Sequence, residues 1–224
     1  MCGRFTLTLD PAQLREAFPG LFIPADIKPR YNIAPSQPVA VIPNTGENKL
    51  DFFTWGLIPF WAKDPAIGNR LINARAETLA EKPAFRSSFR RRRCLILSDG
   101  FFEWKPDLSG KSKTPYYIQM KSGEPFAFAG LWDLWSHPDG SEIRSCTIIT
   151  TTPNELMQTI HNRMPAILSP NSYQTWLDVE EQKPENLTSL LTPYPSSAMS
   201  AYPVSKVVNA PQNDTPECIK PLSG

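Results

Sequence analysis

The amino-acid sequence predicts a single compact α+β domain with a mainly antiparallel, barrel-like β core and a few short helices. Seven short runs of apolar, β-branched and aromatic residues follow one another, with Gly and Pro between them and helical patterns rarely separating them. Proline accounts for 24 of the 224 residues, above a usual share of about 5%, and favours turns over long helices. A parallel, doubly wound sheet is therefore not expected.

The sequence predicts four helices and seven strands along the chain. Asp10-Pro11 predicts the start of a helix through residue 18, and the proline-rich residues 24–38 are predicted to be irregular. Thr152-Pro153 predicts the start of a helix through residues 156–163, with a capping box at Glu155. Short helices are predicted after Ser169-Pro170 and over residues 185–191. The seven predicted strands cover residues 39–43, 50–56, 94–97, 101–105, 115–120, 126–132 and 146–151.

Length and composition limit the class of protein. The chain is 41% hydrophobic and 20% charged, which is typical of a globular protein and not of a disordered one. No repeat or linker divides it, so one domain over residues 1–224 is expected, with residues 211–224 as a C-terminal tail that lacks a role in the chemistry. No apolar run is long enough to span a membrane, and no signal peptide is evident. The sequence predicts a cytoplasmic, nucleoid-associated protein.

Charge is distributed unevenly despite a net value of +1. Residues 1–120 carry 17 Lys and Arg against 11 Asp and Glu, whereas residues 121–224 carry 6 against 11. Four of the arginines are consecutive, from Arg90 to Arg93. Two interpretations remain open for this run: a basic surface for a polyanion, or a solvated segment that leads into a strand.

The cysteines and histidines do not form a metal-binding pattern. The four cysteines contain no CxxC pair, and the chain has only two histidines, so no metal and no cofactor are predicted. Cys94 and Cys146 lie in β-branched runs and are predicted to be buried core thiols. His137 lies in a turn-like segment and receives no role.

Cys2 carries the most chemical information. A small residue after Met1 permits removal of the methionine, which would leave a cysteine with an α-amine and a thiol on adjacent carbons. An aldehyde reacts with such a pair first as a Schiff base and then as a five-membered thiazolidine, because the second step is intramolecular. The alternative interpretation is that Cys2 is incidental.

Other polar residues fit a reactive site around Cys2. In an extended chain Arg4 would lie on the same side as Cys2, and Asn73 and Arg75 have the same spacing. Glu103 lies among aromatic residues, where burial would raise its pKa and suit it to general acid catalysis. Glu103 could instead face solvent on a strand, and His161 could simply cap a helix end.

Aromatic side chains precede the arginine-rich region. Trp55 is predicted to fill the core, whereas Phe60 and Trp61 follow a proline and are predicted to be exposed. Exposed rings beside arginines are typical of surfaces that bind single-stranded nucleic acid.

Short motifs lie along the chain at Cys2-Gly3-Arg4-Phe5, Arg30-Tyr31-Asn32 with Ala34-Pro35, Trp55-Gly56 with Pro59 to Trp61, Asn73-Ala74-Arg75 with Glu77-Thr78, Gly100 to Trp104, and His161 with Arg163 to Pro165. Taken together, these motifs resemble the SRAP family (SOS response-associated peptidase), whose members shield abasic sites in single-stranded DNA by covalent attachment.

The resemblance implies a role for each of these residues. Cys2 would be the nucleophile, Glu103 the general acid and base, Asn73 the group that positions the amine or the sugar, and His161 the residue that assists opening of the sugar ring. It also implies an α+β fold, a monomer, and single-stranded DNA with abasic sites as the partner. The implied DNA contacts are Arg4, Arg75 and Arg163, with Arg86 weaker, and the rings of Phe60 and Trp61.

Two other functions remain open. Cys2 and His161 could form the thiolate–imidazole pair of a cysteine peptidase, for which removal of Met1 from the chain itself is the natural reaction. Arginines and aromatic rings alone would give a module that binds single-stranded DNA without a covalent bond.

Overall fold

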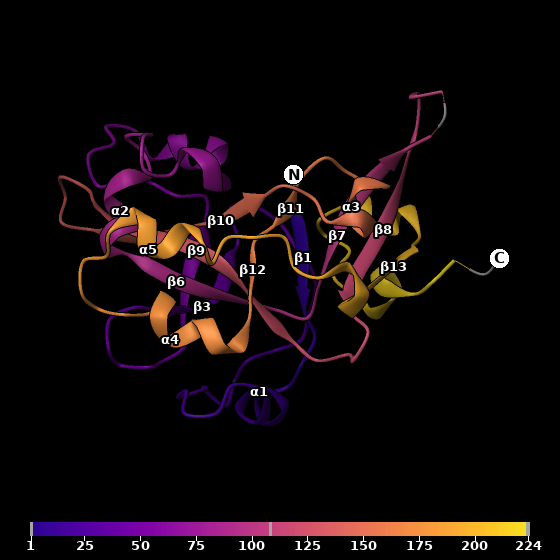
Figure 1. Ribbon diagram of the computed structural model, residues 1–224, viewed down its shortest axis with the longest axis horizontal. Coiled ribbons are helices and arrows are strands. Elements are labelled where there is room, and N and C mark those ends of the chain that lie inside the picture. The colour runs from indigo at the N-terminus through magenta and orange to yellow at the C-terminus, as the bar shows by residue number, and fades with distance from the viewer. Residues whose placement is uncertain (1, 108, 223–224) are drawn as a thin grey trace.

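Two β-sheets form the framework of the protein, which is described by a computed structural model covering residues 2–107 and 109–222. One sheet has the strand order β13-β8-β7-β1-β2. Its strands are β13 (Met199–Pro203), β8 (Lys113–Met120), β7 (Gly100–Pro106), β1 (Arg4–Leu7) and β2 (Arg30–Ile33). It lies on the side of the molecule that carries the C-terminus (Figure 1).

The second sheet closes on itself. Its order is β11-β10-β4-β3-β6-β9-β12, and β9 also pairs with β10, so that β10, β4, β3, β6 and β9 form a closed barrel. The strands are β11 (Met164–Pro165), β10 (Glu142–Thr151), β4 (Asp51–Trp55), β3 (Pro38–Pro43), β6 (Arg93–Ser98), β9 (Phe126–Ser136) and β12 (Ile167–Leu168), with β5 (Asn73–Arg75) beside β10. Only β4 and β5 run parallel to their partner β10 among the described pairings. The predicted fold class is confirmed.

The helices are short, as predicted. They are α1 (Pro11–Ala17), α2 (Arg86–Arg91), α3 (Glu155–Gln158), α4 (Tyr173–Trp176) and α5 (Pro184–Thr188). The short 3-10 helices are η1 (Pro65–Arg70), η2 (Ala76–Thr78), η3 (Pro170–Ser172), η4 (Ser196–Ala198), η5 (Lys206–Asn209) and η6 (Pro216–Ile219). Within the described residues, no helix is long and apolar enough to cross a membrane.

Sequence patterns predict α1 correctly but misplace two other elements. Asp10 caps α1 and forms a capping box with Gln13. The helix predicted after Thr152 is shorter and begins later, because Asn154 is the capping residue and accepts from the Met157 backbone N–H. It ends before Met164, which precedes a proline and is extended in β11. Residues 24–38 are not wholly irregular, since they contain β2, which forms by pairing with β1.

Side chains from β1 and β7 pack into two hydrophobic clusters, one on each face of their sheet. Phe5 and Phe101 pack in the main core, where Phe5 contacts Trp55 and Phe128 edge to face. Phe102 alternates to the opposite face and joins a smaller cluster. Burial on both faces fixes the N-terminal strand between the barrel and the C-terminal residues. Cys94, Cys146 and Trp55 are fully buried, as predicted.

The arginine run is divided between the surface and the interior: Arg90 and Arg91 are exposed, whereas Arg93 is buried. Arg93 is fully buried and donates to backbone carbonyls that include those of Trp176 and Asp178. Arg92 pairs with the buried Asp133, and Arg90 and Arg91 both pair with one glutamate, Glu181. The interpretation as a solvated segment is therefore wrong for Arg93. The carboxylates of Asp133 and Glu181 also neutralise much of the charge that a polyanion would contact.

One close backbone approach shapes the loop that carries Phe60 and Trp61. Gly56 follows β4 with a φ of +136°, and a Cβ atom there would lie 2.7 Å from the Gly68 carbonyl oxygen. Only glycine fits this combination of conformation and space. The loop therefore leaves the barrel at Gly56, returns past Gly68 and enters β5 at Asn73.

Candidate active site

Cys2 and Glu103 come from neighbouring strands. Strands β1 and β7 pair with Arg4 opposite Phe102 and Phe5 opposite Phe101, so continuing the register places Gly3 opposite Glu103. Cys2 is fully buried, and its thiol lies 3.8 Å from the Arg4 carbonyl oxygen, to which it donates. The N-terminal cysteine segment thus lies directly beside the carboxylate.

Burial dominates the electrostatics of this pair. Only 2% of Glu103 is exposed; its burial raises its pKa, and the nearby His161 opposes that shift. The pKa of the Cys2 thiol is also raised, first by burial and second by the negative charge of Glu103. A protonated carboxyl group therefore persists to higher pH here than at the surface, as predicted from its aromatic neighbours.

Asn73 links the barrel to the N-terminal segment. It begins β5, which runs parallel to β10 with Asn73 opposite Ile148. Its side-chain Nδ2 donates to the Cys2 carbonyl oxygen at 2.9 Å. Its Oδ1 is buried and accepts no hydrogen bond from any residue that the structure describes. An acceptor in that position suits a ligand hydroxyl or amine.

His161 reaches the site from the segment between α3 and β11. Its Nδ1 accepts from the Arg163 backbone N–H at 3.1 Å, and its charge acts on Glu103. The fold therefore brings Cys2, Asn73, Glu103 and His161 together from four separate segments.

The predicted DNA-contact arginines lie in different surroundings. Arg163 forms a two-point ion pair with Glu77, at 2.6 Å and 2.9 Å, and also donates to the Thr150 carbonyl oxygen. This pairing lowers the pKa of Glu77, and the charge of Arg75 adds to the effect. Arg75 itself is exposed. Arg75, Glu77 and Arg163 thus form a charged group, with its carboxylate close to both arginines.

Arg4 and Arg86 differ from this group. Arg4 donates to Asn32 Oδ1 at 2.8 Å and to the Val208 carbonyl oxygen at 2.6 Å, whereas Cys2 packs in the main core, so the two side chains have different neighbours. Arg86 is exposed and begins α2, away from the N-terminal end in Figure 1.

Phe60 and Trp61 lie at the surface, as predicted. Their exposed fractions are 55% and 48%. The backbone N–H of Phe60 donates to the buried Asp133 at 3.0 Å, which fixes the base of the loop while leaving both rings accessible. Exposed rings on an anchored loop can stack on bases.

Three residues in this region received no role from the sequence. Asn32 lies in a quoted motif, but its buried amide network became visible only in the fold. Thr150 holds Arg163 through its backbone carbonyl, which no side-chain pattern reveals. Asp214 lies in the predicted tail and binds β2. In the part of the chain that is described, no group of three His, Cys, Asp or Glu residues is placed to hold a metal ion.

Comparison of the chain with known proteins identifies its family. A family model described as SOS response associated peptidase (SRAP) matches residues 1–211. The chain belongs to the SRAP family. All four clustered residues fall within the matched range.

Relatives in the SRAP family are similar to almost the whole of this chain. The chain is 49% identical over 223 residues to "Abasic site processing protein YoqW" of Bacillus subtilis (strain 168), covering 98% of this chain and 99% of that protein. It is 33% identical over 264 residues to "Abasic site processing protein HMCES" of Xenopus tropicalis, covering 98% and 78%. A crystal structure of a protein from Bacteroides thetaiotaomicron superposes with a TM-score of 0.87 at 30% identity, covering 99% of this chain and 100% of the other.

Proposed function

We propose that this protein binds single-stranded DNA and forms a covalent link to abasic sites through a thiazolidine on Cys2, after removal of Met1. Met1 lies outside the described residues. The observation that carries the proposal is the gathering of a fully buried Cys2, the protonatable Glu103, the amide of Asn73 and the imidazole of His161. The names of the relatives, which specify abasic site processing, support the same substrate.

Each residue has a defined step. His161 assists opening of the sugar ring, which exposes the aldehyde. The Cys2 amine adds to the aldehyde carbon, Glu103 donates a proton to the departing hydroxyl group, and water leaves as the imine forms. The thiol sulfur then bonds to the imine carbon, and its proton passes to the nitrogen with the Glu103 carboxylate as the intermediate base. The net change is loss of one water molecule.

The chemistry explains how a lesion without a base is recognised. Base-edge contacts cannot identify an abasic site, but its aldehyde is unlike any group in intact DNA. An imine alone favours elimination at the neighbouring phosphate and cleavage of the strand. Ring closure by the thiol consumes the imine and leaves the strand intact, so the product shields the lesion.

The peptidase alternative requires a different electrostatic setting. A cysteine nucleophile for acyl transfer works as a thiolate, so its pKa is normally lowered by a neighbouring cation. Burial and the charge of Glu103 raise the pKa of Cys2 instead. A thiol that closes intramolecularly onto an imine depends on proximity rather than on a standing thiolate. Peptide cleavage, if present, is expected to be confined to Met1.

Intact-mass analysis tests the proposal directly. The purified protein is expected to lack Met1, and incubation with a single-stranded oligonucleotide containing one abasic site should add the mass of the oligonucleotide less one water. An intact oligonucleotide of the same sequence should add nothing. Equal binding of the two strands without a covalent product would support the plain DNA-binding module and refute the proposal.

The ion pair between Glu77 and Arg163 predicts that removing the charge of Glu77 will increase the affinity for single-stranded DNA. A phosphate that binds Arg163 must replace or approach the Glu77 carboxylate, which is 48% exposed. Glu77→Gln should therefore bind intact single-stranded DNA about 1.4- to fivefold more tightly, since a competing ion pair of this exposure contributes about 0.2–1 kcal/mol. Fluorescence anisotropy at several salt concentrations measures the effect.

The matched control for this measurement is Glu81→Gln, an exposed glutamate in the next turn of the chain. It should leave affinity close to that of the wild type, apart from the general effect of removing one negative charge. Unchanged or weaker binding by Glu77→Gln, relative to this control, would show that Arg163 does not exchange the carboxylate for phosphate.

A further inference from the structure

The C-terminal residues are bound to the strand that follows the cysteine. We call residues 205–219 the C-terminal clasp. Arg4, two residues after Cys2, donates to the carbonyl oxygens of Val208 at 2.6 Å and Asn209 at 3.1 Å within the clasp. Its ring contact with Trp104 adds a cation–π interaction at 6.0 Å. The start of β1 is thus held by the clasp as well as by its neighbouring strands.

The clasp also holds the strand that carries Glu103. Trp104, the next residue along β7, donates through Nε1 to Asn209 Oδ1 at 2.8 Å. The clasp therefore contacts Arg4, two residues from Cys2, and Trp104, the neighbour of Glu103. Because β1 has only four residues, its own ladder provides few hydrogen bonds to fix the segment that contains Cys2.

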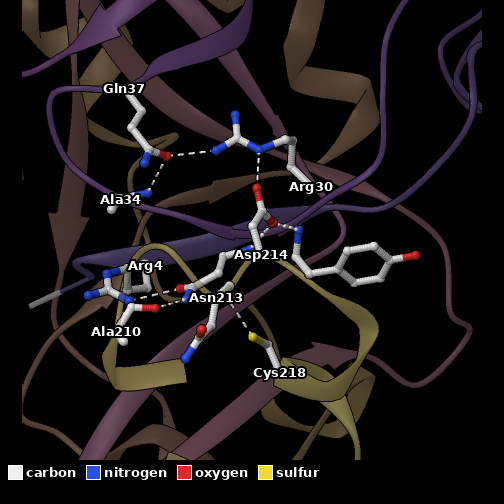
Figure 2. Close-up of polar contacts among 10 residues, drawn as sticks. Arg4, Arg30, Ala34, Gln37, Ala210, Asn213, Asp214 and Cys218 are labelled. Atoms are coloured by element: carbon white, nitrogen blue, oxygen red, sulfur yellow. Dashed lines mark hydrogen bonds and ion pairs between the residues drawn. The ribbon is translucent and has the colours of Figure 1, made fainter. Parts of the chain in front are cut away.

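Asp214 fastens the clasp to β2. Its carboxylate accepts from the Arg30 side chain and from the backbone N–H groups of Tyr31 and Asn32 (Figure 2). The fully buried Asn32 returns three hydrogen bonds, which go to the carbonyl oxygens of Val208, Ala210 and Asn213. Cys218 is buried and donates to the Asn213 carbonyl oxygen at 3.0 Å.

We propose that the C-terminal clasp is a positioning element for the crosslinking reaction and that Asp214 is the positioning residue that fixes it. This inference rests on the proposed function. Asp214 and Cys218 lie beyond residues 1–211, the range that the family model matches. The segment predicted from the sequence to be a tail without a role thereby acquires one, through the places of Arg4 and Trp104 beside Cys2 and Glu103.

Single-turnover kinetics of the full-length chain tests the inference. With protein in excess over a labelled single-stranded oligonucleotide that has one abasic site, the maximal crosslinking rate and the half-saturating protein concentration are measured separately. Asp214→Ala should lower the maximal rate about 10- to 100-fold, because small displacements of reacting groups have effects of this size. The half-saturating concentration should change less than about twofold. Asp214→Asn keeps an acceptor for the backbone N–H groups, so its maximal rate should lie between those of Asp214→Ala and the wild type.

A matched control separates positioning from loss of stability. Asn44 is another buried polar residue; it bonds the backbones of Arg91, Arg93 and Asp178 instead of the clasp. Asn44→Ala should lower the melting temperature and leave the maximal rate per folded molecule unchanged. An equal loss of rate in both variants, at matched folded fraction, would overturn the inference.

A milder variant keeps the test decisive if Asp214→Ala does not fold. Trp104→Phe removes the hydrogen bond to Asn209, weakens the ring contact with Arg4, and should lower the maximal rate in the same direction but by less. A wild-type rate in this variant and in Asp214→Asn would refute the role of the clasp while leaving the crosslinking function intact. Failure of the wild-type protein to crosslink at all would instead refute the proposed function.

Discussion

A Cys2→Ala protein is expected to form no stable covalent link to abasic single-stranded DNA. Alanine retains the α-amine after removal of Met1, so an imine still forms, but no thiol is present to close the ring. The imine hydrolyses or leads to strand cleavage, whereas the wild-type adduct survives denaturation. Denaturing electrophoresis of the reaction should show loss of essentially all the adduct, and borohydride should trap the imine in the variant.

Cys2→Ser is a more conservative test, because it replaces only the Sγ atom by an oxygen. A hydroxyl group closes onto an imine less favourably than a thiol, so the variant should give a link that hydrolyses within the assay. Cys146→Ala is the matched control: it removes another fully buried thiol and should crosslink like the wild type at equal folded fraction. A wild-type yield from Cys2→Ala, or an adduct mapped to another side chain, would refute the mechanism.

Glu103→Gln is expected to slow crosslinking about 10²- to 10⁴-fold, the usual range for loss of a general acid or base. The amide keeps the shape of the side chain but cannot donate a proton to the departing hydroxyl group or accept one from the thiol. Non-covalent affinity for intact single-stranded DNA should stay within about twofold, since the residue is buried. The matched control Glu142→Gln alters an exposed glutamate at the start of β10 and should leave the rate unchanged.

The same substitution should make the protein more stable at neutral pH. Burial raises the pKa of Glu103 in the folded state above its ordinary value of 4.5. Below that value both states are protonated and the residue has little effect. As pH rises further, the unfolded state loses its proton first, which favours unfolding. Glutamine removes this contribution.

Thermal unfolding at two pH values checks whether Glu103→Gln stabilises or destabilises the protein. The melting temperature of Glu103→Gln should exceed that of the wild type at pH 7, by about 2–4 °C for each kcal/mol gained in a chain of this size. The difference should shrink toward pH 4. A variant less stable than the wild type at pH 7 would show that the charged form is favoured by its neighbours over its cost of burial.

Some features could be predicted from local sequence because they depend on nearest neighbours. Asp10-Pro11 defines the start of α1 through hydrogen bonds to the next turn, and β-branched runs form the barrel strands wherever their apolar side chains are buried. Cys2 and Glu103 could likewise be proposed as reactive from residue chemistry: an aminothiol on one residue, and a carboxylate flanked by aromatic rings.

Other features arise only when distant segments meet. Arg93 is a charged residue in a basic run, yet carbonyl groups from α2 and from the residues after α4 surround it. Asp214 has no local pattern, because its partners Arg30 and Asn32 lie more than 180 residues earlier in the chain. No local rule relates such pairs.

The sequence by itself determined the short-strand β architecture, the core thiols and the proposed reactive group at Cys2, since each depends on side-chain chemistry or on contacts within a few residues. The tertiary structure alone decided that Asn73 and His161 lie beside that group, that Arg163 is paired with Glu77, and that the C-terminal clasp holds β1. The physical reason is that these arrangements come from strand pairing between remote segments, whose register is set by burial of the whole sheet rather than by any one segment.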